Sequence, residues 1–179
     1  MNAWVGPAIV AAAISSVIGV LSLYLNAWLT LRLDRTRRLE KVRDVQIALL
    51  AEIRADIHNL KFFDLDENLA MVRESYETIP GYSARPSQPP PILMEEMIKA
   101  EVQILPSWVI DGVFLYLRQK KTIEVFVQDM RGDGFVARSK ETQLLMYADY
   151  IDMKKTELKF ARNARDTLEA SLEVGAVGQ

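Results

Sequence analysis

The chain has 179 residues, half of them hydrophobic, a formal net charge of −2 and no cysteine. This length suggests one domain, or one small domain with appendages. The lack of cysteine excludes disulfides, cysteine-based zinc sites and cysteine nucleophiles. The sequence beyond residue 43 is acidic, which argues against general nucleic-acid binding, because that function needs a basic face on the folded part.

The first predicted element is a membrane span. Residues 1–31 contain no charged side chain, and Pro7 suits the first turn of a helix because its missing N–H would be unpaired there. A helix over residues 7–31 would be about 37 Å long, against about 30 Å for the hydrocarbon core of a bilayer. A cleaved signal peptide would have basic residues before its apolar stretch, and an interfacial helix would need a polar face. A buried core helix rarely runs so long without a charge. We therefore predict a single transmembrane anchor at residues 1–31.

A basic collar follows the predicted span in the stretch "RLDRTRRLEKVR". Its six basic residues are Arg32, Arg35, Arg37, Arg38, Lys41 and Arg43, against two acidic ones. Basic residues beside a span stay on the cytoplasmic side, and they attract anionic lipid headgroups. The collar predicts a bacterial inner-membrane protein with its N-terminus outside and residues 32–179 in the cytoplasm.

Two rows of small residues at a spacing of four lie within the predicted span. They are Ala8, Ala12 and Ser16, and Ala11, Ser15 and Gly19. Such rows let two transmembrane helices approach closely, and they predict a packing face for a homo-oligomer or a partner helix. The alternative is that these residue types are simply common in membrane helices.

The predicted cytoplasmic part starts with amphipathic helices in residues 32–79. An apolar stripe with helical spacing runs through Leu39, Val42, Val45, Leu49, Ile53, Ile57, Leu60 and Phe63. Residues 64–79 predict a further short helix. Residues 80–91 hold five of the seven prolines and predict an irregular linker, either a spacer or a loop lying on the surface.

Helical bundle segments are predicted over residues 92–173. A short helix halted at Pro106 is followed by a longer one reaching Met130, although the "VFV" run within residues 123–128 could also be a strand. Gly132 and Gly134 predict a break, and the Arg-Gly-Asp triplet beside them is interpreted as a turn. Ser139 is placed to cap the last helix, residues 139–173, and residues 174–179 are expected to be a frayed tail. The predicted fold is all-α, an N-terminal transmembrane helix followed by a cytoplasmic antiparallel helical bundle.

Two stretches resemble a loose set of small bacterial and prophage single-span membrane proteins of unknown function. They are "LLAEIRADI" at 49–57 and "ILPSWVIDGVFLYL" at 104–117, the second with the pattern Leu105-Pro106, Val109, Val113-Phe114 and Tyr116. The shared features are an N-terminal span, a basic collar, an "AEI" helix and this segment before a last long helix. The resemblance implies no activity, substrate or cofactor.

No assembled catalytic constellation is visible, so the sequence predicts no enzyme, no cofactor, no metal site and no small-molecule substrate. His58 is the only histidine, and the glycine-rich phosphate-binding motifs are absent. The leading interpretation is a single-pass protein that presents a cytoplasmic helical bundle as a protein-docking or accessory-subunit module. Its partners would be membrane lipid and either another protein or a second copy. The alternatives are a phage or mobile-element envelope, lysis or exclusion factor, and a stator-like stalk subunit of a membrane complex.

Overall fold

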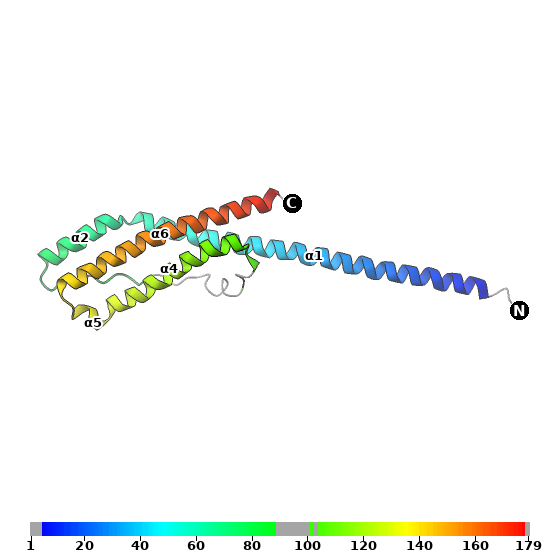
Figure 1. The fold of residues 1–179 in the computed structure, drawn as a ribbon, viewed down its shortest axis with the longest axis horizontal. Coiled ribbons are helices and arrows are strands. Elements are labelled where there is room, and N and C mark those ends of the chain that lie inside the picture. The colour runs from blue at the N-terminus through cyan, green and yellow to red at the C-terminus, as the bar shows by residue number, and fades with distance from the viewer. Residues whose placement is uncertain (1–4, 89–100, 102–103, 178–179) are drawn as a thin grey trace. The chain divides into compact units, whose positions relative to one another are not determined.

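The computed structural model describes residues 5–88, 101 and 104–177, and every regular element among them is a helix (Figure 1). The all-helical prediction is confirmed for this part of the chain, which contains no strand. The chain divides into two compact units, Met1–Val42 and Arg43–Gln179, and each is considered by itself.

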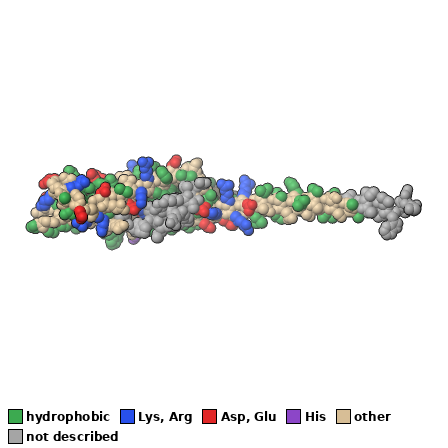
Figure 2. Space-filling model, turned by 90° about the horizontal axis from the view of Figure 1, so that it is seen from below, with side chains coloured by type: hydrophobic (Ala, Val, Ile, Leu, Met, Phe, Trp, Pro, Cys, Tyr) green, Lys and Arg blue, Asp and Glu red, His purple; other side chains and the backbone are tan. Residues whose placement is uncertain are grey.

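Helix α1, Val5–Phe62, runs from the predicted span through the collar and into the second unit. Pro7 lies in its first turn, where a missing N–H breaks no helical hydrogen bond. Among the described residues, α1 is the one helix long and apolar enough to cross a membrane, and none of its apolar window is buried. Figure 2 shows hydrophobic side chains along this part of α1, with Lys and Arg side chains gathered next to it.

Helix α2, Leu65–Thr78, begins after a two-residue break and confirms the short helix predicted at 64–79. The Asp64 carboxylate caps it by accepting hydrogen bonds from the backbone N–H groups of Asp66 and Glu67, both at 3.0 Å. The helix ends at Ile79, before a turn in which Gly81 has a φ of +76°, a conformation that favours glycine.

The proline-rich stretch is irregular from residue 80 to 88, as predicted, but it is not a free spacer. Ala84 and Pro86 are buried. The Ala84 N–H donates to the Tyr76 hydroxyl at 3.0 Å, and the Arg131 guanidinium donates to the Pro86 carbonyl at 3.1 Å. Residues 82–86 are therefore packed against the helices. Residues 89–91, and nearly all of the helix predicted for 92–105, lie outside the described residues.

Helix α4, Ser107–Arg131, starts directly after Pro106 and includes residues 123–128, so the "VFV" run is helical. The four-residue helix α5, Asp133–Val136, follows Gly132, so the Arg-Gly-Asp triplet joins two helices. Its one buried residue, Phe135, anchors this connection.

Helix α6 runs from Lys140 to Val177. The Ser139 hydroxyl accepts a hydrogen bond from the Thr142 N–H at 3.3 Å, which is the predicted cap. The expected end at residue 173 is four residues too early, because residues 174–177 continue the helix. Gly175 alone does not stop it, since glycine lowers helix stability by only about 1 kcal/mol.

Helices α4 and α6 pack against each other in opposite directions. Gly112 lies against Ala164, and the Gln119 side chain donates to the Met153 carbonyl at 3.0 Å. Residue numbers therefore increase along α4 where they decrease along α6, as in an antiparallel pair. A Cβ at Gly112 would be 3.1 Å from the Thr167 hydroxyl oxygen, so the small residue permits this close approach.

Two apolar clusters form the core of the second unit. The first joins Val45–Ile57 of α1 to α4 and the C-terminal half of α6 through Leu49, Ile53, Val109, Val113 and Leu168. The second joins α2, the proline-rich stretch, the end of α4, α5 and the N-terminal half of α6, through Val72, Tyr76, Ala84, Met130, Phe135, Tyr147 and Ile151. The α1 stripe is buried only in its middle, because Leu39 and Phe63 at its ends are largely exposed.

Candidate functional site

A buried charge network joins α1 to α4 within the second unit. The Asp56 carboxylate on α1 accepts hydrogen bonds from the Tyr116 hydroxyl and the Lys120 ammonium on α4. Tyr116 and Lys120 are four residues apart, so both side chains lie on the same face of α4. The side chains of Lys120 and Asp56 are only 8% and 15% exposed. An acid and a base thus neutralise each other inside the helical core.

A second ion pair lies nearby on α6. The Lys154 ammonium is 2.7 Å from the Glu157 carboxylate, and these side chains are 17% and 4% exposed. The charge of Glu157 also acts on the Tyr116 and Tyr150 hydroxyls, which places it close to the first network. Charged side chains from α1, α4 and α6 are therefore gathered in one region.

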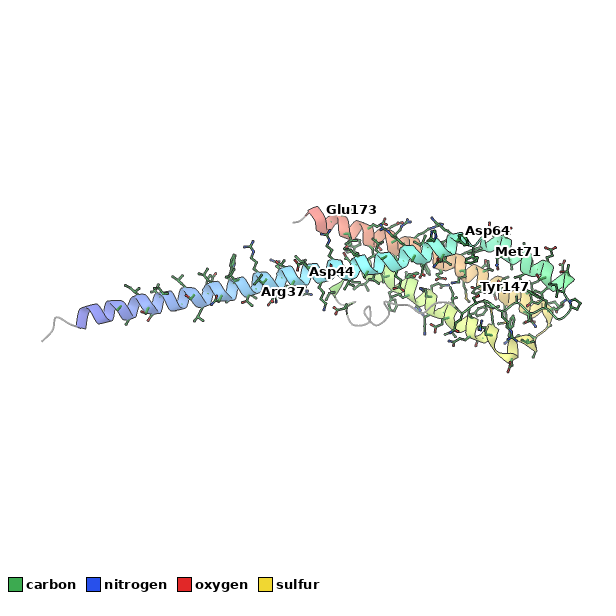
Figure 3. The ribbon with its side chains drawn as sticks, turned by 180° about the vertical axis from the view of Figure 1, so that it is seen from behind. Arg37, Asp44, Asp64, Met71, Tyr147 and Glu173 are labelled. Carbon is green, nitrogen blue, oxygen red and sulfur yellow. The ribbon has the colours of Figure 1, made fainter. Side chains whose placement is uncertain are left out.

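Three tyrosines in this part of the molecule are held in their neutral form. Burial, then the hydrogen bond to Asp56, raises the pKa of Tyr116 far above its ordinary value. Burial raises the pKa of Tyr147 to about 12, and burial with the charge of Glu157 raises that of Tyr150. Tyr147, labelled on α6 in Figure 3, donates to the Asn68 side-chain oxygen of α2 at 2.7 Å.

These tyrosines predict a loss of stability in alkali. In an unfolded chain Tyr147 would release its proton near its ordinary pKa of 10, whereas the folded protein holds it up to about 12. Unfolding then releases a proton between pH 10 and 12, so the free energy of unfolding is unaffected below pH 10 and falls above it. Tyr147 alone accounts for up to about 2–3 kcal/mol.

Urea unfolding at stepped pH, with tyrosinate absorbance recorded in parallel, measures this effect. Tyr147→Phe should reduce the decrease in the free energy of unfolding above pH 10 by the contribution of Tyr147. Ionisation of all tyrosines near pH 10 while the protein remains folded would contradict the burial argument.

The network borders a cavity of about 350 Å³. Its walls come from the end of α1, the start of α2, the proline-rich stretch, α4 and α6. Asp56, Lys120, Lys154 and Glu157 are among its polar lining groups, together with Arg85. The apolar lining includes Phe63, Leu65, Ile123, Val127, Tyr147 and Ile151.

The residues singled out from the sequence lie elsewhere, along α1. All six basic collar residues are exposed, and Figure 3 shows Arg37 projecting from the helix. Ala11, Ala12, Ser15, Ser16 and Gly19 are also exposed, and the side chain of Ala8 lies outside the described set. Nothing within 4 Å would meet a Cβ at Gly19, so the packing face stays a prediction. His58 is exposed, and no cluster of three metal-ligating side chains is found in the described part of the chain.

The charge network was not predicted from the sequence. Its signal was the regular spacing of Val109, Val113, Tyr116, Lys120, Ile123, Val127 and Met130, all buried in α4. A lysine that continues an otherwise apolar stripe needs a buried partner, and the partner is Asp56, which lies directly beside the stripe position Ile57 on α1.

Comparison with protein-family models finds none that matches, and comparisons with curated proteins and with solved structures likewise find no match. The resemblance to single-span bacterial membrane proteins therefore stays a prediction. The function has to be argued from the residues themselves.

Proposed function

We propose that this chain is a single-pass protein of the bacterial inner membrane, and that its second unit is a helical bundle that serves as a protein-docking or accessory-subunit module at the cytoplasmic face. The observation that carries the proposal is the apolar part of α1. Residues 14–31 are uncharged and exposed throughout, whereas the unit from Arg43 onward buries two apolar clusters between its own helices. A long apolar helix without protein contacts is stable in lipid and unfavourable in water.

The polar groups of this stretch support a lipid environment. The Ser16 hydroxyl donates to the Ala12 carbonyl and the Thr30 hydroxyl to the Asn26 carbonyl, both at 2.8 Å. Such bonds within the helix satisfy hydroxyl groups where no water is available. The Ser16 hydroxyl would then be accommodated in the hydrocarbon layer, and the Thr30 hydroxyl close to its boundary.

The end of the stretch has the features of a membrane boundary. The Arg32 guanidinium lies 5.3 Å from the centre of the Trp28 ring. Tryptophan favours the interface, and arginine beside it can reach the headgroups. Collar residues near the surface would each contribute about 1 kcal/mol through anionic lipid, and they favour the cytoplasmic orientation.

The second unit suits a docking role because it has a packed interior of its own. Its helices are held by two apolar clusters and by polar contacts such as Gln46 to Ser171, at 2.9 Å in the interior. An anchored unit of this kind offers a fixed surface at the membrane. The stator-like alternative is less favoured, because α1 ends at Phe62 and the chain then folds back on itself.

The topology is tested by reporters fused after Gln179. We expect green fluorescent protein to be fluorescent there and alkaline phosphatase to be inactive, because the collar retains the second unit in the cytoplasm. Replacing Arg35, Arg37 and Arg38 with alanine should weaken this preference. Replacing Arg73, Arg138 and Arg162, which lie far along the chain from the span, is the matched control.

An active phosphatase fusion would contradict the orientation and the docking role together. It would favour the alternative of an envelope or lysis factor, which needs the helical unit outside. If the orientation holds, isolation of the intact protein in mild detergent, with identification of co-purifying chains, tests the docking role itself.

A further inference from the structure

The cavity beside the buried charge network has the dimensions and lining of a small-molecule site. Its volume of about 350 Å³ is within the range typical of ligand pockets. Apolar and aromatic side chains dominate its surface, and a few charged groups converge on it from three helices. This combination distinguishes binding sites from packing defects, whose walls are apolar throughout.

The charges at the cavity favour an anion. Both carboxylates are already neutralised within the protein, Asp56 by Lys120 and Glu157 by Lys154. Arg85 adds a further positive charge, and no described carboxylate forms an ion pair with it. The local balance at the lining is therefore positive.

Hydrogen-bond donors also remain for a ligand. An ammonium group has three donors, and the described contacts of Lys120 and of Lys154 each use one on a carboxylate. The guanidinium of Arg85 can bind a carboxylate through two parallel bonds.

The wall that contains Arg85 is already in position. The neighbouring Pro86 carbonyl accepts from Arg131, and the Ser83 hydroxyl donates to Gln143 at 2.9 Å. Binding would therefore not need to order this segment, which lowers its entropic cost.

We propose that this cavity binds one small amphipathic anion, an aromatic or branched aliphatic carboxylate. Its charged group interacts with Arg85 and the cavity lysines, and its apolar body packs against Phe63, Leu65 and the Tyr150 ring. The sequence predicted no small-molecule substrate, and this proposal concerns a bound ligand that is not transformed. It is independent of the docking role, because the cavity lies wholly within the second unit.

The test is a fluorine NMR titration of the full-length protein in mild detergent, with 4-(trifluoromethyl)benzoate as probe. The uncharged 4-(trifluoromethyl)benzamide has nearly the same shape and serves as the matched probe, and empty micelles are the blank. We expect saturable binding of one benzoate per chain, severalfold tighter than that of the benzamide. Arg85→Gln should weaken the benzoate roughly fivefold to tenfold and leave the benzamide unchanged.

Two further variants make the result specific. Arg73→Gln removes an exposed arginine outside the cavity lining and should change neither probe. Ser87→Trp puts a large ring on the exposed rim of the cavity and should weaken both probes without loss of helicity. The proposal is overturned if neither probe saturates, if both bind equally, or if benzoate binding is the same in Arg85→Gln as in the unmodified protein.

Discussion

Replacement of Asp56 with alanine should lower the free energy of unfolding by about 3 kcal/mol. The change removes the carboxylate that neutralises Lys120 and accepts the Tyr116 hydroxyl bond. Lys120 is then left without its carboxylate partner at a site where its side chain is only 8% exposed. Removing one partner of a buried ion pair is among the most destabilising single substitutions known. Urea unfolding of the full-length protein in detergent, followed by tryptophan fluorescence, measures the change.

Two controls separate the cost of the unpaired charge from the loss of a contact. Asp56→Ala combined with Lys120→Met should regain much of the stability, because an apolar pair leaves no buried charge. Lys155→Ala breaks the exposed pair with Asp66, whose atoms are 2.6 Å apart and whose side chains are 43% and 79% exposed. That control should have little effect on the free energy of unfolding, because an exposed ion pair contributes little to stability. If Asp56→Ala costs no more than Lys155→Ala, water reaches the network and it is not part of the core.

The helices were predictable because their signals are local. These signals are the recurrence of apolar residues every three to four positions, the cap at Ser139 and the restart after Pro106. All of them depend only on residues close together in the chain. The structure places helices at the described segments that these signals mark, α1, α2, α4 and α6.

The choice of buried face on α4 was less predictable. Phenylalanine is far more hydrophobic than lysine, but Phe114 is 59% exposed, whereas Tyr116 and Lys120 are buried. The outcome depends on Asp56, which lies 64 residues from Lys120 in the chain. A polar residue is buried when a distant partner satisfies it, and no local pattern reveals that partner.

The packing of the proline-rich stretch also depends on distant partners that the local sequence does not reveal. Its composition predicted an irregular backbone, and the backbone is irregular over residues 80–88. Composition did not reveal that the Tyr76 hydroxyl donates to Gln143 at 2.9 Å and also accepts from the Ala84 N–H. That contact fixes one wall of the cavity, so the candidate site was not visible before the fold.

Removal of residues 1–42 should move the protein completely from the membrane fraction to the soluble fraction. The remaining chain, from Arg43 to Gln179, is a compact unit with both apolar clusters intact. It loses the exposed apolar stretch that is long and apolar enough to cross a membrane, and its size is sufficient for a core of its own. We expect it to be strongly helical by circular dichroism and monomeric by light scattering. The full-length protein, washed with high salt, should stay with the membrane.

The state of the shortened chain also tests how self-association arises. If the full-length protein in detergent is larger than a monomer and the shortened chain is not, the small-residue rows of the span are the contact, and Gly19→Ile should reduce the size. A stable dimer of the shortened chain would instead place the contact on exposed apolar residues of the second unit, such as Trp108 and Phe114. An aggregated or unfolded chain would show that the two clusters are insufficient alone. The second unit would then need a partner chain to complete its core, as in a constitutive subunit of a membrane complex.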